Sequence, residues 1–275
     1  MKTLRYRSRD PEVYFLEEIL QSLGYEVVVT TYFGRDTQRA IMDFQLRENL
    51  VVDGIVGLKT WSKLLEAREN LMSFSDKLLG EQDLIDFANK YDLELAVIKA
   101  VNEIESSGKG FLIDGRPRIL FEGHIFWKQL EKRGLDPTDF LTEYTENVLY
   151  PSWVRKHYEG GAAEYERLEK AAGMSDIDAV HDAAYASASY GSFQIMGFHF
   201  ADLGYPTVDS FVAAMYTHER EHLKAFGRFL EANNLLRHLK SKNWRAFARG
   251  YNGAGFESNR YDTKLERAYR KYQNL

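Results

Sequence analysis

Apolar and polar positions alternate along the first quarter of the chain with the period of short amphipathic helices. Asp10 followed by Pro11 predicts a helix start, because aspartate caps free backbone N–H groups and proline suits the first helical turn. Gly24 predicts the end of this helix, and two more helices are expected from about Asp36 and after Gly57. The positions expected to face inward are Val13, Leu16, Leu20, Leu23, Ala40, Ile41, Phe44, Trp61, Leu64 and Leu65. The pattern therefore predicts a small three-helix domain.

The rest of the chain is expected to be mostly helical, with one exception. The apolar runs Phe111–Ile113 and Ile119–Phe121 surround an Asp-Gly pair, and this arrangement predicts a β-hairpin. Proline lacks the backbone donor that a strand interior needs, so Pro117 is expected at the edge of the hairpin.

Later helices are expected at 124–133 and from Phe211 to about Leu239, the latter as one long helix or two. The fold class predicted is mainly α: a small three-helix bundle followed by an α+β domain with a short β-hairpin or sheet. The predicted domains are residues 1–68 and 81–275, and residues 69–80 are expected to form a partly helical linker between them.

Composition excludes several classes of protein. The chain has 275 residues, of which 44% are hydrophobic and 28% charged, and such a mixture forms a folded core. The net charge is −5 and no basic block occurs, which argues against nucleic-acid binding. The chain has no cysteine, so disulfides, thiol nucleophiles and thiolate metal sites are excluded.

Two glutamates at the end of one predicted helix carry the first chemical signal. The helix is expected over residues 95–105, and Glu105 lies within its apolar arc, whereas Glu103 points to the opposite side. The arc consists of Ile98, Val101 and Ile104. Burial disfavours the ionised form of a carboxyl, so Glu105 is a candidate general acid. A glutamate paired with an arginine at a helix end is the alternative interpretation.

The N-terminal domain has a recognisable series of residues. It contains a glycine, a helix that ends in Phe-Gln, an Asp-Gly turn and a helix with Thr-Trp. These residues are Phe33, Gly34, Thr37, Ala40, Phe44, Gln45, Asn49, Leu50, Asp53, Gly54, Ile55, Val56, Gly57, Thr60 and Trp61. Over residues 10–66 the series resembles the three-helix peptidoglycan-binding domain of cell-wall hydrolases. Such residues also serve as turns and core, so the motif is chiefly a signature of the fold.

Three short motifs follow in the larger domain. Glu105 precedes Ser-Ser-Gly, residues 190–197 read YGSFQIMG, and residues 248–253 read ARGYNG. They resemble the catalytic glutamate, the Gly-x-x-Gln-Ile segment and the Ala-Tyr-Asn-Gly element of goose-type lysozymes and lytic transglycosylases, with Arg-Gly interposed in the last. The stretches GFLIDGRPRILFEGHIFW, ASYGSFQIMGFHF and WRAFARGYNGAGFESNRYD extend the similarity. Residues 83–272 resemble the N-acetylmuramidase domain of modular bacteriophage endolysins.

This resemblance implies a lysozyme-like fold and a function. The implied reaction is hydrolysis of the β-1,4 bond between N-acetylmuramic acid and N-acetylglucosamine in peptidoglycan. Glu105 is then the general acid that protonates the glycosidic oxygen, and Gln194, Tyr251 and Asn252 line the sugar cleft. Tyr190, beside the loop of Gln194, is a further candidate for the cleft. No cofactor and no metal are expected.

A second carboxylate would decide the mechanism. An inverting enzyme has its base about 6.5–9.5 Å from the acid, and a retaining one has its nucleophile at about 5–5.5 Å. A lytic transglycosylase, the alternative function, uses the 6-hydroxyl of muramic acid and leaves anhydro ends. Glu122, directly after the second apolar run, is the candidate, or else a structural acid that holds Arg116, Arg118 or His124. Asp114 is expected to be a turn residue.

Residues 218–222 read HEREH and match the H-E-x-x-H motif of zinc peptidases. The metzincin continuation fails, because Ala225 and Arg228 stand where glycine and histidine are needed. No third ligand has convincing spacing. We therefore interpret His218 and His222 as histidines satisfied near a core or cleft, and a zinc peptidase stays a remote alternative.

The resemblance also implies a biological setting. An endolysin causes lysis of the host cell at the end of infection, and the N-terminal domain would concentrate it on peptidoglycan. The start of the chain lacks the apolar core of a signal peptide and no run of 18 apolar residues occurs, so no membrane insertion is expected. The protein is expected to be a monomer, made in the host cytoplasm, that acts on the wall in the periplasm and needs a holin for release. A wall-binding adaptor without activity is the third alternative.

Overall fold

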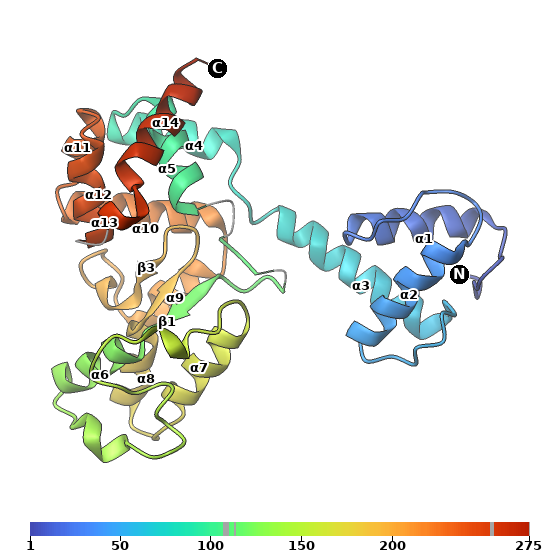
Figure 1. The fold of residues 1–275 in the computed structure, drawn as a ribbon, viewed down its shortest axis with the longest axis horizontal. Coiled ribbons are helices and arrows are strands. Elements are labelled where there is room, and N and C mark those ends of the chain that lie inside the picture. Colours follow the sequence, from blue (N-terminus) through green and yellow to red (C-terminus); the bar gives the residue numbers. More distant parts are fainter. Residues whose placement is uncertain (107–109, 113, 254–255, 275) are drawn as a thin grey trace. The chain divides into compact units, whose positions relative to one another are not determined.

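The structure is a computed structural model in which most of the chain folds into two compact units (Figure 1). These units are Met1–Asp76 and Lys77–Leu275, and each is described by itself. The residues that the structure describes are 1–106, 110–112, 114–253 and 256–274. The expected fold class is confirmed: the protein is mainly α, with a helical N-terminal domain and one small sheet in the larger domain.

The N-terminal unit consists of three helices and the loops between them. They are α1 (Pro11–Ser22), α2 (Arg35–Arg47) and α3 (Leu58–Ser75). Asp10 caps α1 as predicted, since its side chain accepts a hydrogen bond from the Glu12 N–H at 3.0 Å. α3 is longer than the short helix expected there, and it includes the first part of the 69–80 segment. The core of the unit is Leu4, Val13, Leu16, Ile19, Leu20, Val27, Phe33, Ala40, Ile41, Phe44, Val56, Trp61 and Leu64.

Gln45 explains why Phe-Gln and Asp-Gly occur together in this unit. Its side chain is 1% exposed, and its Oε1 accepts a hydrogen bond from the Gly54 N–H at 2.9 Å. Its Nε2 donates to Asp53 Oδ1 and to the Ile55 carbonyl, both at 3.0 Å. Gly54 has a φ of +69°, which residues with a side chain rarely adopt. The motif therefore fixes the turn that follows α2.

The larger unit is built from helices around a small sheet. Its helices are α4 (Glu81–Tyr91), α5 (Leu95–Val101), α6 (Gly123–Lys132), α7 (Ala163–Ala172), α8 (Asp178–Ala186), α9 (Val208–Met215), α10 (Glu219–Ala232), α11 (Leu236–Lys240), α12 (Trp244–Asn252), α13 (Phe256–Asn259) and α14 (Tyr261–Gln273). Short 3-10 turns are η2 (Pro137–Phe140), η3 (Arg155–His157) and η4 (Gly197–His199). The C-terminal helix α14 packs against α5, near the start of the unit (Figure 1).

The sheet has the order β1-β2-β3 and is antiparallel throughout. Its strands are β1 (Ile119–Phe121), β2 (Ala188–Tyr190) and β3 (Ile195–Met196). Ile119 lies opposite Tyr190, and Ser189 lies opposite Met196. The central strand β2 therefore ends at Tyr190, the first residue of the YGSFQIMG motif, and β3 lies within that motif.

The hairpin predicted around the Asp-Gly pair is present in part, but its second arm is not Ile119–Phe121. Phe111 forms an antiparallel bridge with Pro117, and the Arg118 N–H donates to the Gly110 carbonyl at 2.8 Å. The strand Ile119–Phe121 pairs instead with β2 from much later in the chain. The turn itself exists, since the Leu112 N–H donates to the Arg116 carbonyl at 2.8 Å. Ile119 and Phe121 of β1 are buried in the core of this unit. Ile113 lies outside the described residues.

One long helix or two were expected from Phe211 to about Leu239, and the structure has three, α9, α10 and α11. His218 starts α10 by accepting a hydrogen bond from the Arg220 N–H at 2.8 Å. Asn234, with a φ of +54°, lies in the left-handed region between α10 and α11. These two positions interrupt a hydrophobic pattern that is continuous in the sequence, because polar caps and turns outweigh periodicity there.

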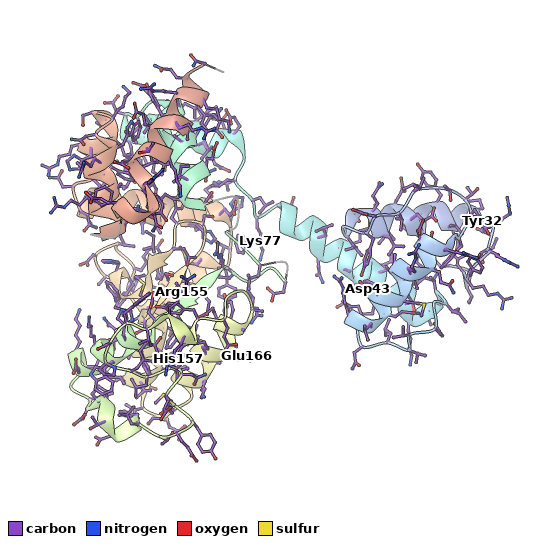
Figure 2. The ribbon with its side chains drawn as sticks, in the orientation of Figure 1. Tyr32, Asp43, Lys77, Arg155, His157 and Glu166 are labelled. Atoms are coloured by element: carbon purple, nitrogen blue, oxygen red, sulfur yellow. The ribbon has the colours of Figure 1, made fainter. Side chains whose placement is uncertain are left out.

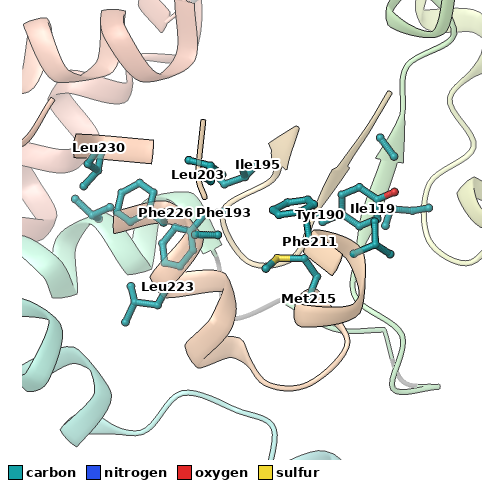
Figure 3. Close-up of a cluster of buried hydrophobic side chains, with 14 of the residues drawn as sticks. Ile119, Tyr190, Phe193, Ile195, Leu203, Phe211, Met215, Leu223, Phe226 and Leu230 are labelled. Carbon is teal, nitrogen blue, oxygen red and sulfur yellow. The ribbon is translucent and has the colours of Figure 1, made fainter. Parts of the chain in front are cut away.

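Aromatic rings join α10 to the β2–β3 loop at the centre of this unit (Figure 3). The rings of Phe193 and Phe226 stack, with centroids 4.4 Å apart and planes 14° apart. Tyr190 meets the edge of Phe211 at 5.6 Å. The segment that carries the Gln-Ile motif is thus held by ring contacts with α9 and α10.

Candidate active site

Glu105 lies in a π-turn rather than in a regular helix. α5 ends at Val101, and the chain continues as η1 (Asn102–Ser106), where the regular α-helix was expected to reach Glu105. Such wider turns are rare and are often found at functional sites. Glu103 is exposed, as expected, and its Oε2 accepts hydrogen bonds from Lys271 Nζ at 2.7 Å and from the Tyr272 hydroxyl at 2.6 Å.

The side chain of Glu105 is half-buried and lies beside residues of α12 and α14. Asn252 donates a hydrogen bond from Nδ2 to Glu105 Oε1 at 3.4 Å. Burial raises the pKa of Glu105 to about 7, against smaller opposing effects of the Asn252 hydrogen bond and the Lys264 charge. The charge of Glu105 in turn contributes, after burial, to raising the pKa of Tyr251 and of Tyr261. A carboxyl in these surroundings exists in both protonation states near neutral pH.

Tyr251 directly precedes Asn252 in α12 and lies near Glu105. Its hydroxyl donates to the Phe193 carbonyl at 2.6 Å, so this group links α12 to the β2–β3 loop. Its ring stacks on Phe247 with centroids 5.6 Å apart, and its edge meets Phe226. The sequence predicted that Tyr251 and Asn252 lie near Glu105. In the structure both lie beside it, and Asn252 contacts it directly.

Gln194 uses its side chain to hold the loop together. Its Oε1 accepts a hydrogen bond from the Ser189 hydroxyl at 2.9 Å, and its Nε2 donates to the Gly191 and Arg118 carbonyls at 2.8 and 3.2 Å. Its φ of +47° is unusual for a residue with a side chain. These bonds support a role for Gln194 in shaping the loop; the predicted sugar contact stays a prediction.

Tyr190 does not line a cleft, which corrects the expectation for this residue. Its side chain is 1% exposed, and its hydroxyl donates to the Tyr185 carbonyl at 3.0 Å. The ring belongs to the core beneath the sheet (Figure 3). Its position beside the Gln194 loop suggested the cleft, but in β2 its ring packs against α9 and leaves no face for a sugar.

Glu122 has partners that differ from those of Glu105. The Tyr158 hydroxyl donates to Glu122 Oε2, and His124 Nδ1 lies 3.3 Å from the same oxygen. Burial raises the pKa of Glu122, although the Tyr158 hydrogen bond and the Arg167 charge oppose it. Arg155 and His157, labelled in Figure 2, belong to the turn before Tyr158.

Within the described parts of the chain, no hydrogen bond or ion pair joins Glu122 to Glu105. The role of Glu122 as a second catalytic group therefore stays a prediction. Asp114, expected as a turn residue, receives the Arg116 N–H at 3.1 Å and its side chain at 2.7–2.9 Å.

The HEREH segment is engaged in hydrogen bonds. His218 caps α10, while His222 is 1% exposed and has both ring nitrogens in contact with other residues, Ser192 and Met215. Elsewhere, ligand atoms of His181, Asp182 and Asp209 lie within 4.8 Å of one another, and exposed groups of this kind are common without an ion. The sequence reasoning missed Lys264 and Tyr261 of α14, because no local pattern indicates that α14 packs beside η1.

Comparisons with known proteins identify the families of both units. Residues 94–273 match the N-acetylmuramidase family, and residues 9–64 match a peptidoglycan-binding domain family. The crystal structure of the endolysin of Burkholderia phage AP3 is similar, with 41% sequence identity, a TM-score of 0.66 and coverage of 100% of both chains. No curated protein sequence matches. Among the described helices, none has the length and apolar character to cross a membrane.

Proposed function

Since the chain belongs to the N-acetylmuramidase family and is a peptidoglycan-hydrolysing glycoside hydrolase, we propose that Glu105 is the general acid of its reaction. The observation that carries this proposal is a half-buried carboxyl, hydrogen-bonded to Asn252, whose pKa burial raises to about 7. A general acid works best when its pKa lies near the operating pH, because it must be protonated before the step and give up its proton during it. Glu103, two residues away and ion-paired, lacks both properties.

The hydrogen bond from Asn252 suggests which oxygen carries the proton. Since Asn252 Nδ2 donates to Oε1, that oxygen accepts, and Oε2, which has no hydrogen bond to any residue that the structure describes, can hold the acidic hydrogen. Oε2 donates this proton to the glycosidic oxygen while the bond from that oxygen to C1 of N-acetylmuramic acid breaks. A water molecule then adds to C1 and loses a proton, which in sum replaces the proton that Glu105 donated. The products are an N-acetylmuramic acid end with a hydroxyl on C1 and an N-acetylglucosamine end with a free hydroxyl, and Glu105 is again protonated. Asn252 and the positive charge of Lys264 favour the carboxylate that remains.

The test replaces Glu105 by an uncharged residue of the same shape. Glu105→Gln retains an oxygen for Asn252 but has no acidic hydrogen, and we expect the release of reducing ends to fall by about 10³-fold. Glu103→Gln is the matched control, because it makes the same change two residues away on an exposed position, and it should stay within about twofold of wild type. Retention of the wild-type rate by Glu105→Gln would remove Glu105 from the mechanism.

Glu122 is the candidate for the group that activates the water. The hydrogen bond that Glu122 accepts from the Tyr158 hydroxyl favours the alternative in which Glu122 is a structural acid. Glu122→Gln tests this point, because loss of a catalytic base would lower kcat by about 10²-fold or more. Loss of a structural acid would lower the stability and leave kcat nearly unchanged.

For the N-terminal unit we propose wall binding through a groove beside α2. The groove has a volume of about 400 Å³ and is lined by Gly24, Tyr25, Glu26, Asp36, Arg39, Ala40, Asp43 and Arg47. Asp43 binds the Tyr25 hydroxyl at 3.0 Å and Arg47 Nε at 2.8 Å (Figure 2 labels Asp43). The groove is lined by both acidic and basic side chains. Such a lining suits the peptide stems of peptidoglycan, which carry carboxylates and amines.

Binding to purified sacculi tests this groove without interference from cleavage. In the full chain that carries Glu105→Gln, the additional change Arg47→Gln should reduce the bound fraction severalfold. Arg270→Gln is the control, since Arg270 and Arg47 are similarly exposed, at 72% and 70%, and each is paired with an acid four residues away. Equal loss in both variants, or none in either, would contradict a role for the groove.

We also propose that the protein is a phage endolysin that acts on the host wall from the inside. This setting rests on the 41% identical phage endolysin, and it requires passage of the inner membrane through a holin. Expression in a bacterial cytoplasm should leave cells intact until the membrane is permeabilised, when lysis follows. A single peak at the monomer mass in light scattering is expected.

A further inference from the structure

Three buried polar side chains form a cluster outside the immediate contacts of Glu105. Ser192 is 2% exposed, Glu219 is 6% exposed and His222 is 1% exposed. Two of them, Glu219 and His222, belong to the HEREH segment. Buried polar groups are costly unless they are hydrogen-bonded, so the bonds of this cluster indicate its task.

Glu219 joins three separate segments through its carboxylate. Its Oε1 accepts hydrogen bonds from the Gly110 N–H at 3.1 Å and from the Ser192 hydroxyl at 3.3 Å. Its Oε2 accepts from the Leu79 N–H at 2.9 Å. A Cβ at Gly110 would come within 2.2–2.3 Å of Ser192 Oγ and Glu219 Oε1, so only glycine permits this approach. Gly110 follows Glu105 by five residues in the chain.

His222 adds a second connection to the same serine. Its Nδ1 accepts a hydrogen bond from the Ser192 N–H at 3.1 Å, so the ring proton must lie on Nε2. Nε2 then donates to the Met215 carbonyl at 2.7 Å, at the end of α9. Gly191 lies against the ring, where a Cβ would approach to 2.6 Å. The bonds fix one tautomer of His222 and leave neither nitrogen for a metal ion.

Ser192 is connected to Glu105 through a short series of contacts. The next residue, Phe193, stacks on Phe226 of α10, and its carbonyl accepts the Tyr251 hydroxyl at 2.6 Å. Tyr251 precedes Asn252, which donates to Glu105. A displacement of the loop at Ser192 therefore moves the carbonyl that positions Tyr251 and, with it, the donor to Glu105.

We propose that Ser192, Glu219 and His222 are positioning residues for glycan cleavage. They hold the segment at Gly110 and the β2–β3 loop against α10, and through Tyr251 they keep Asn252 in place beside Glu105. This inference rests on the proposed role of Glu105. It gives the HEREH segment a function in glycan hydrolysis in place of zinc chemistry.

A buried serine of the same unit provides a matched control. Ser187 is 0% exposed, and its hydroxyl donates to the Ala183 carbonyl at 2.6 Å, away from the cluster. Ser187→Ala and Ser192→Ala each remove one buried hydroxyl, so both should lower the melting temperature to a similar extent. Only Ser192→Ala should also change catalysis, with kcat about tenfold lower at nearly constant KM, since small misplacements near a reacting group have effects of this order.

The pH profile and a pair of variants at His222 separate positioning from plain folding. In Ser192→Ala, looser packing admits water to Glu105, so the fall of kcat at alkaline pH should begin at a lower pH than in wild type. His222→Asn can still accept from the Ser192 N–H through Oδ1, whereas His222→Leu cannot, and the asparagine variant should retain several times more activity.

Soluble peptidoglycan fragments are the substrate, and Glu105→Gln is measured in the same series. The proposal is overturned if Ser192→Ala and Ser187→Ala have the same kcat and pH profile, or if the two His222 variants are equally active. Wild-type activity in Glu105→Gln would instead overturn the proposed function. The two failures are therefore distinguishable.

Discussion

Glu105→Gln should stabilise the protein in alkaline solution, even though it removes activity. Burial disfavours the ionised form of a carboxyl. Such a group therefore destabilises the folded state at a pH where the same carboxyl is ionised in the unfolded chain. Glutamine has nearly the same shape and can accept the Asn252 hydrogen bond, but it never ionises. The comparison between the two side chains therefore isolates the electrostatic cost of keeping Glu105 in its site.

The size of this effect follows from the pKa of Glu105, which burial raises from 4.5 to about 7. Below the ordinary value the carboxyl is protonated in both folded and unfolded states, so it contributes nothing to the pH dependence. As the pH rises from the ordinary to the raised value, the unfolded chain loses its proton first, and the folded state becomes progressively less stable. Above pH 7 the difference reaches about 3 kcal/mol, since each pKa unit corresponds to about 1.4 kcal/mol.

Urea unfolding of wild type and Glu105→Gln at pH 4 and pH 8 measures this difference. The variant should gain about 3 kcal/mol relative to wild type between the two pH values. Glu103→Gln should behave in the opposite way, because the hydrogen bonds from Lys271 and Tyr272 lower the pKa of Glu103. A stability difference between wild type and Glu105→Gln that does not change with pH would show that Glu105 is not desolvated and that its pKa is not raised.

Three further outcomes are expected. The hydrolysis rate should fall as the pH rises through about 7, because Glu105 then loses the proton that it must donate; a profile flat to pH 9 would contradict this. Glu164→Gln should lower the free energy of unfolding by about 3–5 kcal/mol in urea titrations, since it leaves the buried Arg167, 2.7 Å from Glu164, without its partner. Glu122→Gln should keep kcat within about threefold of wild type while lowering the melting temperature; a loss of about 10²-fold would make Glu122 catalytic.

Local patterns in the sequence predicted the features that depend on neighbouring residues. The cap at Asp10 is a contact within a few residues and was correctly predicted. The exposure of Glu103 followed from helical periodicity alone, although the turn there is π rather than α. The mainly α fold class followed from the same periodicity and from the motifs.

Contacts between distant segments were not predictable in the same way. β1 pairs with β2 from nearly 70 residues later, and nothing in either short run specifies that partner. Tyr190 was expected in the cleft because of its neighbour in sequence, but its side chain faces α9. The HEREH segment has the spacing of a metal motif, and only the fold shows that Glu219 meets Gly110 and Ser192 instead. Packing across the chain decides these cases.

Mass analysis of the fragments released from purified peptidoglycan, before and after borohydride reduction, shows whether the protein hydrolyses the glycan strand and whether Glu105 is needed for it. Wild type should release fragments that end in reducible N-acetylmuramic acid, and Glu105→Gln should release almost none. Fragments with anhydro ends, lighter by one water and resistant to reduction, would contradict hydrolysis. Cleaved peptide stems with intact glycan strands would contradict glycan cleavage altogether.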